Sequence, residues 1–291
     1  MAFIKRVWIS GSDGRLGTEL ARLLNPEDIE IIATDKEVVD ITKSEEVAIF
    51  VDRNRPHIII NCSAITDPEY CENHPEEAFL VNGLGARNLA VSANRINAKL
   101  IHLSTDDVFN GEENILYKEY DRDKIVPSTI YGKSKLFGEK SIEKFSTTHF
   151  IIRSSWLYGR GNKTVENYIE LAKKGEVIKV PKEQYAAPTS AYELAKFISF
   201  LMHTYEYGTY HAVCQGSCSR KEFAEEVLKI AGVKGVVVED EGHENQEFRP
   251  NYTILDDFLL RISGIYKFPH WKDALRGYIE NMDNTKGARR W

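Results

Sequence analysis

Gly11-Ser12-Asp13-Gly14-Arg15-Leu16-Gly17 is the stretch that decides the fold of this chain. It follows an apolar run at residues 7–9, typical of a buried parallel strand, and it opens a helical pattern in which four leucines share one face: Leu16, Leu20, Leu23 and Leu24. A glycine-rich turn between a strand and a helix directs backbone N–H groups and the positive helix end toward a phosphate. The spacing, Gly-x-x-Gly-x-x-Gly, differs from the standard Gly-x-Gly-x-x-Gly, so the turn alone indicates a phosphate site only weakly.

An acidic residue follows the turn at the distance expected of a ribose-binding carboxylate. A second apolar run, residues 29–33, ends in Thr34-Asp35. An acid about 20 residues beyond such a turn hydrogen-bonds the ribose of a bound dinucleotide. Together, the turn and Asp35 predict a dinucleotide-binding unit.

The composition is that of an ordinary globular protein. The chain has 291 residues, of which 42% are hydrophobic and 28% charged, so it can bury a sizeable core in one large or two intimate domains. A net charge of −6 gives no reason to expect a nucleic-acid or anionic-membrane partner. We find no signal peptide and no apolar run long enough to span a membrane, and we therefore expect a cytoplasmic protein.

The spacing of cysteines and histidines predicts no metal site. The four cysteines, Cys62, Cys71, Cys214 and Cys218, form no Cys-x-x-Cys pair. A disulfide or metal at Cys214 and Cys218 is disfavoured in a reducing compartment. We interpret Cys62 as a small buried hydrophobe and His102, inside a strand pattern, as a core histidine.

Strands and helices alternate through the first half of the chain. Strands are expected at residues 6–10, 29–33, 57–61, 100–104 and 149–153. Helices are expected at residues 16–24, 44–55 (capped by Ser44), 75–97 and 131–145, with loops at 63–74 and 105–128. Near-continuous apolar strands alternating with helices predict an α/β fold, a doubly wound, Rossmann-like parallel sheet covered on both faces.

The regular alternation of strands and helices ends after residue 153. Further helices are expected at residues 165–174, 193–204 and, capped by Ser219, up to residue 231; short strands are expected at 177–180 and 208–213, and fraying at 284–291. We expect a dinucleotide-binding domain at residues 1–156, with 190–213 returning to it, and a smaller C-terminal substrate domain at 157–291. Because ligands bind beyond the carboxyl ends of parallel strands, the pocket should lie in the cleft between the two domains.

Tyr131-Gly-Lys-Ser-Lys135 is a second motif whose side chains could take part in catalysis. Residues four apart share one face of a helix, so Tyr131 and Lys135 are neighbours. A free tyrosine has a pKa near ~10, and an ammonium beside it would lower that pKa and ease proton exchange. Alone, such a pair is usually a solvated surface feature. Here the hydroxyls of Ser104 and Thr105, at a strand end, supply the third member of a site.

The ordered motifs resemble one family in particular. They are similar to the extended short-chain dehydrogenase/reductases and, more narrowly, to the dTDP-4-dehydrorhamnose reductase family, from about residue 5 to residue 280. The matching pieces are the glycine turn, Asp40-Ile41-Thr42, Arg55-Pro56, Asn82, Ser104-Thr105-Asp106, residues 131–139 and 153–159, Gln184 with Pro188-Thr189, and Arg249-Pro250 followed by Leu255-Asp256.

The resemblance implies an oxidoreductase of nucleotide-sugar and cell-surface polysaccharide biosynthesis. Its reaction would be NADH- or NADPH-dependent reduction of the 4-keto group of a dTDP-6-deoxy-hexose. The implied catalytic residues are Thr105, Tyr131 and Lys135. The implied cofactor contacts are Gly11, Gly14, Arg15, Leu16, Gly17, Asp35, Asp40, Ile41, Ala64, Ile65, Thr66, Tyr131 and Lys135, and the implied substrate contacts are Thr105, Asp106, Trp156 and Arg249.

Several implied roles have a structural alternative. Asp40 could touch the adenine side of the cofactor or be a turn acid before the next helix. Trp156 could stack on the sugar or base, or belong to the core. Arg249 could pair with the substrate diphosphate or anchor the C-terminal segment.

The family pattern is broken beside the expected pocket. Asp107 and Ile65 stand where the family usually has tyrosine, and Ala186 where it has glycine. Asp106-Asp107 approximates the acid–base pair of nucleotide-sugar 4,6-dehydratases, which gives a dehydratase or epimerase as one alternative. A non-catalytic subunit resembling the regulatory subunit of methionine adenosyltransferase is another, although the intact triad argues against it.

The charges around Asp35 bear on cofactor choice. A carboxylate at this place accepts bonds from both ribose hydroxyls of NADH and repels the 2′-phosphate of NADPH. Lys36 or Arg15 could offset that repulsion. We expect both cofactors to work, with a mild preference for NADH, in a monomer or homodimer whose partner is a small nucleotide sugar.

Overall fold

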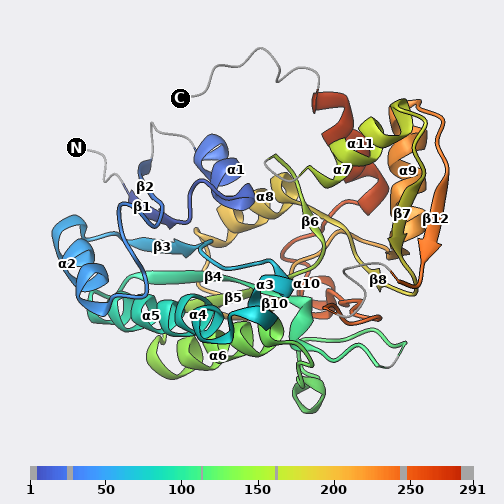
Figure 1. Cartoon of the computed structure of the whole chain (residues 1–291). Coiled ribbons are helices and arrows are strands. Elements are labelled where there is room, and N and C mark those ends of the chain that lie inside the picture. The colour runs from blue at the N-terminus through green and yellow to red at the C-terminus, as the bar shows by residue number, and fades with distance from the viewer. Residues whose placement is uncertain (1–4, 25–28, 113, 161–162, 243–247, 283–291) are drawn as a thin grey trace.

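A six-stranded parallel sheet forms the centre of the protein (Figure 1). The computed structural model describes residues 5–24, 29–112, 114–160, 163–242 and 248–282, so the fraying expected at 284–291 lies outside the described residues. All pairings in the sheet are parallel. In spatial order the strands are β10 (Gly208–His211), β5 (His149–Ser154), β4 (Lys99–Thr105), β3 (Ile58–Asn61), β1 (Lys5–Ser10) and β2 (Ile29–Thr34).

Helices cover both faces of this sheet, as Figure 1 shows, and this confirms the predicted doubly wound α/β fold. Side chains alternate along β1: Val7 and Ile9 enter one core, and Trp8 enters the other. The first core contains α1 (Arg15–Leu23) and α8 (Ala191–Leu201). The second contains α2 (Ser44–Asn54), α5 (Ala86–Arg95) and α6 (Ile130–Phe145).

The strand order reverses between β1 and β3. Chain connections run outward from this point in both directions, which opens a crevice beyond the carboxyl ends of the two strands. The residues after β1 are the glycine turn, and the residues after β3 begin at Cys62. The sequence places its phosphate-binding pattern at the switch point of the sheet.

The long helix expected at residues 75–97 is interrupted. It consists of α4 (Pro75–Ala78), the π-helical segment η1 (Phe79–Gly85) and α5. The loop expected at 63–74 contains another short helix, α3 (Pro68–Asn73), capped by the Asp67 carboxylate, which accepts from the Tyr70 N–H. Ser44 does not cap α2: it is the first helical residue, the N-cap position is Lys43, and no side chain caps the helix there.

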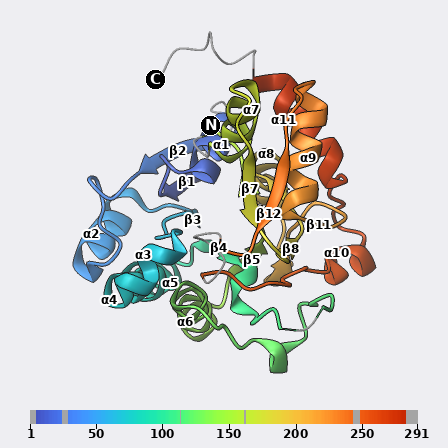
Figure 2. The same cartoon turned by 45° about the vertical axis from the view of Figure 1, so that its right-hand side comes forward.

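Much of the chain after β5, apart from α8 and β10, builds a smaller unit beside the carboxyl ends of the sheet (Figure 2). A parallel pair, β7 (Ile178–Pro181) and β12 (Val237–Asp240), packs with α7 (Thr164–Lys173) and α9 (Arg220–Ala231) around a core that includes Ile178 and Val180. Ser219 caps α9 in a complete capping box with Glu222, as predicted. Remaining elements are β6 (Leu157–Tyr158), β8 (Tyr185–Ala186), β9 (Thr189–Ser190), β11 (Cys218–Ser219), α10 (Phe258–Ser263), α11 (Trp271–Met282) and the 3₁₀ turns η2 (Asp106–Val108) and η3 (Arg122–Lys124).

Candidate active site

The glycine turn is shaped by close backbone contacts. Gly11 has a φ of 73°, donates its N–H to the Thr34 carbonyl at 2.8 Å, and leaves no room for a Cβ, which would lie 2.7 Å from the Ser63 nitrogen. A Cβ at Gly17 would collide with the Gly11 carbonyl oxygen. Gly14 is extended and precedes α1, so the N-terminus of that helix opens at the switch point. Bare backbone N–H groups at a helix start fit a bound diphosphate.

Asp35 and Asp40 follow β2, and the structure separates their roles. The Asp35 carboxylate closes the turn after the strand by accepting from the N–H groups of Glu37 and Val38 at 3.0 and 3.2 Å. Asp40 accepts from the N–H and hydroxyl of Thr42 at 3.0 and 2.7 Å, which favours the turn acid over the adenine contact. Ile41 is buried in the second core.

An asparagine in the π-helical segment holds the loop predicted to contact the cofactor. The Asn82 amide accepts from the Ile65 N–H at 2.9 Å and donates to the Ile65 carbonyl at 3.0 Å, and it also donates to the Ser134 hydroxyl. Ala64 and Thr66, on either side of Ile65, line the same cavity as the glycine turn. Asn82 therefore ties this loop to α6 and fixes it relative to Tyr131.

The three predicted catalytic residues meet at the carboxyl end of β4. Thr105 ends that strand, and Tyr131 and Lys135 lie one turn apart on α6. The Thr105 hydroxyl is hydrogen-bonded to the Tyr131 hydroxyl, and both side chains line the cavity. The buried Lys135 ammonium donates to the Leu103 carbonyl at 2.6 Å.

The expectation that Lys135 lowers the pKa of Tyr131 is not met in this structure. Burial, followed by the charge of Asp107, raises the pKa of Tyr131 above its ordinary value. The cation that opposes this rise is Arg249, whose guanidinium carbon lies 6.0 Å from the Tyr131 ring centroid. Burial lowers the pKa of Lys135 to about 8. Because its own pKa is raised, the Tyr131 phenol is protonated at neutral pH.

The two carboxylates that follow Thr105 both have hydrogen-bond or ion-pair partners. Asp106 accepts hydroxyl hydrogen bonds from Ser155 at 2.7 Å and from Thr253 at 2.5 Å. Asp107 forms an ion pair with Arg249 at 3.1 Å. Both acids are 2% exposed, so each depends on these partners for the stability of its charge.

Trp156 is positioned by an arginine that the sequence pattern did not single out. Trp156 has a φ of 39°, and the Arg220 guanidinium carbon lies 3.5 Å from its ring centroid, so the cation covers one face of the indole. Arg220 also donates from Nε to the Gln184 side-chain oxygen at 3.3 Å. The sequence gives little indication of this contact, because an arginine directly after a helix cap resembles an ordinary surface residue.

A buried ion pair stabilises the carboxyl end of β4. Arg153 on β5 forms a pair with Glu139 on α6 at 2.7 Å, and the Ser104 hydroxyl donates to the same carboxylate at 2.5 Å. His102 is fully buried against the Asn61 amide at 2.9 Å, and burial lowers its pKa, as expected of a core histidine. These contacts fix α6 against β4 and β5, the elements that carry the triad.

One cavity of about 770 Å³ brings most predicted residues together. It lies between the carboxyl ends of the sheet and the unit built by α7, β7 and α9. Predicted residues that line it are Gly14, Arg15, Leu16, Ala64, Thr66, Thr105, Asp106, Tyr131, Trp156 and Arg249. Predicted residues that do not line it are Gly11, Gly17, Asp35, Asp40, Ile41, Ile65 and Lys135.

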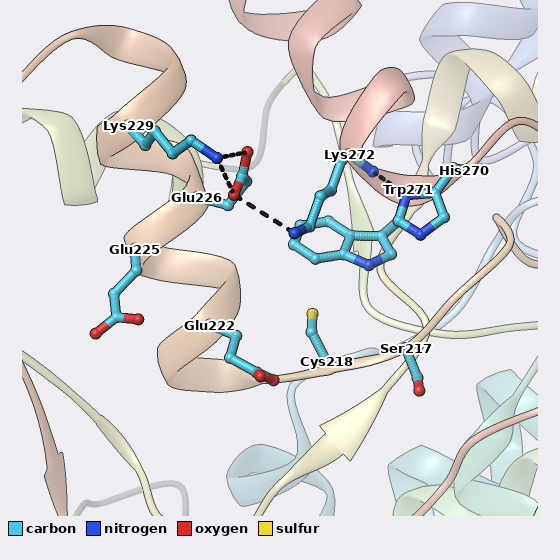
Figure 3. Close-up of a pocket in the computed structure, with 9 residues that line it drawn as sticks. All are labelled: Ser217, Cys218, Glu222, Glu225, Glu226, Lys229, His270, Trp271 and Lys272. Atoms are coloured by element: carbon cyan, nitrogen blue, oxygen red, sulfur yellow. Dashed lines mark hydrogen bonds and ion pairs between the residues drawn. The ribbon is translucent and has the colours of Figure 1, made fainter.

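A second hollow of about 430 Å³ lies between α9 and the start of α11 and contains none of the predicted residues (Figure 3). Both of its lysines are paired with one carboxylate: Glu226 contacts Lys229 at 3.2 Å and Lys272 at 3.7 Å. All four cysteines are free, and within the described ranges no cluster of three metal-ligating side chains occurs. No helix among the described residues is long and apolar enough to cross a membrane.

The parallel sheet, the glycine turn at its switch point and the Thr105–Tyr131–Lys135 constellation define a nicotinamide-dependent oxidoreductase of the short-chain dehydrogenase/reductase class. Comparison with known proteins specifies the family. The family model described as RmlD substrate binding domain matches residues 5–284. The chain belongs to the dTDP-4-dehydrorhamnose reductase family.

Individual relatives cover nearly the whole chain. It is 35% identical to the spore coat polysaccharide biosynthesis protein SpsK of Bacillus subtilis, over 96% of this chain and 99% of that protein. It is 34% identical to the dTDP-4-dehydrorhamnose reductase of Escherichia coli, over 96% and 98%. The crystal structure of the Bacillus anthracis dTDP-4-dehydrorhamnose reductase in complex with NADP superposes with a TM-score of 0.91 at 38% identity, over 96% and 100%.

Proposed function

We propose that this protein reduces the C4 keto group of a dTDP-6-deoxy-hexose, converting dTDP-4-dehydrorhamnose to dTDP-L-rhamnose with NADH or NADPH. The observation that carries the proposal is the pair of hydrogen-bonded hydroxyls, Thr105 and Tyr131, in the wall of the cavity into which the glycine turn also opens. The family relationship supplies the substrate class.

The residues at the switch point fit a nicotinamide dinucleotide. Gly11, Gly14 and Gly17 let the turn fold tightly, because a Cβ at each would meet nearby backbone atoms, and Asp35 directly follows β2, the position at which a ribose is held. When bound, the reduced nicotinamide supplies the hydride that the C4 carbon receives. We assign Lys135 to binding of the nicotinamide ribose. The loop around Ile65 is assigned to contacts with other parts of the dinucleotide.

Tyr131 donates the proton in this proposal. Its raised pKa keeps the phenol protonated at neutral pH, which is the form needed to protonate a developing alkoxide. The Thr105 hydroxyl donates a hydrogen bond to the same oxygen and stabilises the negative charge as it forms. Asp106, held by Ser155 and Thr253, anchors the backbone that presents Thr105.

The setting of the two carboxylates favours the reductase over a 4,6-dehydratase. A dehydratase needs a free acid and a free base beside the sugar, whereas Asp106 is bound by hydroxyls and Asp107 is paired with Arg249. The proposal includes a cytoplasmic location, which the four free thiols fit, and a monomer or homodimer.

Product analysis tests the reaction against both alternatives. Purified protein is incubated with dTDP-4-keto-rhamnose and a reduced cofactor, and separately with dTDP-glucose and an oxidised cofactor. We expect a dTDP-hexose reduced at C4 from the first mixture and no product from the second. A 4-keto sugar from dTDP-glucose would identify a dehydratase. Tight binding to a synthetase partner, with no turnover of any nucleotide sugar, would support the regulatory role.

A further inference from the structure

Three arginines line the same cavity, Arg15, Arg220 and Arg249, and among the described residues only Arg249 is paired with a carboxylate. Arg249 forms its ion pair with Asp107. Arg220 contacts the Gln184 amide and the Trp156 ring, and among the described residues no carboxylate lies within ion-pair distance of it. Lys179 also lines the cavity, but its ammonium is paired with Asp240 at 3.2 Å. The lining also contains the carboxylates of Asp67 and Asp106, so its three arginines leave an excess of positive charge. In a chain of net charge −6, that excess points to an anionic ligand.

The local fold presents the Arg220 guanidinium to the cavity in a fixed position. Arg220 is the first residue of α9, directly after the Ser219 cap, and its N–H donates to the Gln184 carbonyl at 3.1 Å. The pairing of β11 with β8 holds the same two segments together. The indole of Trp156 and the Gln184 side chain then orient the guanidinium, using Nε but neither terminal nitrogen.

The chemistry of an unpaired guanidinium specifies its ligand. Burial lowers the pKa of Arg220 to about 10, so it remains a cation at neutral pH. Two free terminal nitrogens in one plane match two oxygens of a phosphate group. The glycine turn already accounts for the diphosphate of the cofactor.

We propose that Arg220 is a substrate-binding residue that holds the diphosphate of the nucleotide sugar, together with Arg249. This inference rests on the proposed function and deepens it by naming the group that selects a nucleoside diphosphate. Arg249 lies beside Tyr131, and Arg220 lies on the side of the cavity formed by α9. The diphosphate would therefore be held between the reacting sugar and the α7–β7 end of the cavity.

Calorimetric binding of dTDP and of thymidine tests the proposal without turnover. The variant Arg220→Met should weaken dTDP binding by about 10- to 100-fold, the loss of a charge-assisted contact, and leave the affinities for thymidine and NADPH unchanged. Arg220→Lys keeps the charge and loses the planar fork, so a smaller loss is expected. Arg276→Met, an exposed arginine on α11, serves as the matched control and should bind dTDP like the wild type.

Three results would overturn the inference: no dTDP binding by the wild type, unchanged dTDP binding by Arg220→Met, or a loss confined to NADPH, which would assign Arg220 to the cofactor. If Arg220→Met does not fold, the comparison of Arg220→Lys with the wild type decides in the same way. Failure of the proposed function looks different. In that case dTDP binding would depend on Arg220, but no keto sugar would be reduced.

Discussion

Asp107 and Arg249, 142 residues apart in the sequence, form an ion pair of 3.1 Å, and Arg249 lines the large cavity between the sheet and the smaller unit. Burial raises the pKa of Asp107 to about 7, although the adjacent Arg249 opposes the rise. Near neutral pH the carboxylate is therefore half protonated, and the charge available on Arg249 depends on pH.

This pair predicts a pH-dependent affinity for the nucleotide sugar. As the pH rises through about 7, Asp107 ionises and competes with the substrate diphosphate for Arg249. We expect the KM for the keto sugar to increase roughly 3- to 10-fold between pH 6 and pH 8. Steady-state kinetics in a constant-ionic-strength buffer measure this change.

Asp107→Asn isolates the titrating group. The amide cannot ionise, so the KM of this variant should be low and nearly constant over the same pH range. Of the other charged groups near Asp107, Arg220 has a pKa of about 10 and does not titrate there. An unchanged pH profile in Asp107→Asn would show that another group controls binding.

The pair formed by Glu139 and Arg153 predicts a large effect on stability. Glu139→Gln removes the charge that compensates a buried guanidinium, and we expect a loss of about 3 kcal/mol in the free energy of unfolding. Urea denaturation measures it. Glu143→Gln, an exposed position on the same helix, is the control and should change the free energy by less than about 0.5 kcal/mol. Equal effects in the two variants would contradict the assigned role of the buried pair.

We predict that tolerance of the NADPH 2′-phosphate depends on Lys36 rather than on Arg15. Arg15 donates to the Leu157 carbonyl at 2.6 Å and faces the catalytic cavity, whereas Lys36 is exposed beside Asp35. We expect both cofactors to work with a mild preference for NADH, and Lys36→Ala to lower kcat/KM about 3- to 10-fold with NADPH only. Lys140→Ala, on the exposed face of α6, should change neither value. A wild-type preference for NADPH beyond ~100-fold, worth about 2.7 kcal/mol, would refute the weight given to Asp35.

Gly17→Ala tests the close packing of the glycine turn. The new methyl group would meet the Gly11 carbonyl and, at 2.6 Å, the Ser12 Cα, so the turn must open. We expect a loss of about 1–3 kcal/mol in stability and weaker NADPH binding, measured by denaturation and fluorescence titration. Gly277→Ala, in α11 with open space around it, should be neutral or slightly stabilising. Wild-type cofactor affinity in Gly17→Ala would show that the turn does not hold the cofactor.

Local patterns in the sequence predicted the sheet well, and they predicted that Thr105, Tyr131 and Lys135 meet at the carboxyl end of β4. The apolar strands, the glycine turn and the spacing of Tyr131 and Lys135 depend on short-range periodicity, which survives in any tertiary context. The π-helical segment around Asn82 could not be predicted from short-range periodicity. Its Gly83 and Gly85 lie in close contact with Phe137 and Ile41, which are distant in the sequence, so its surroundings follow from tertiary packing.

The residues that sequence reasoning misjudged depend on the exact bounds of an element or on long-range contacts. Ser44 has the chemistry of a helix cap, but α2 begins at Ser44 itself, so it cannot occupy the N-cap position. Arg220 became a candidate only when folding brought it against Trp156, 64 residues earlier in the chain. The expected lowering of the Tyr131 pKa was wrong because burial and the charge of Asp107 raise it.

The most direct test of the central claim is the turnover of Tyr131→Phe. With dTDP-4-keto-rhamnose and NADH or NADPH, the wild type should oxidise the cofactor, seen as loss of its absorbance, and the variant should be slower by about 10²- to 10⁴-fold while still binding the cofactor. Tyr205→Phe, at a tyrosine that is 79% exposed, should retain wild-type activity. Normal turnover by Tyr131→Phe would contradict the assignment of Tyr131 as the proton donor.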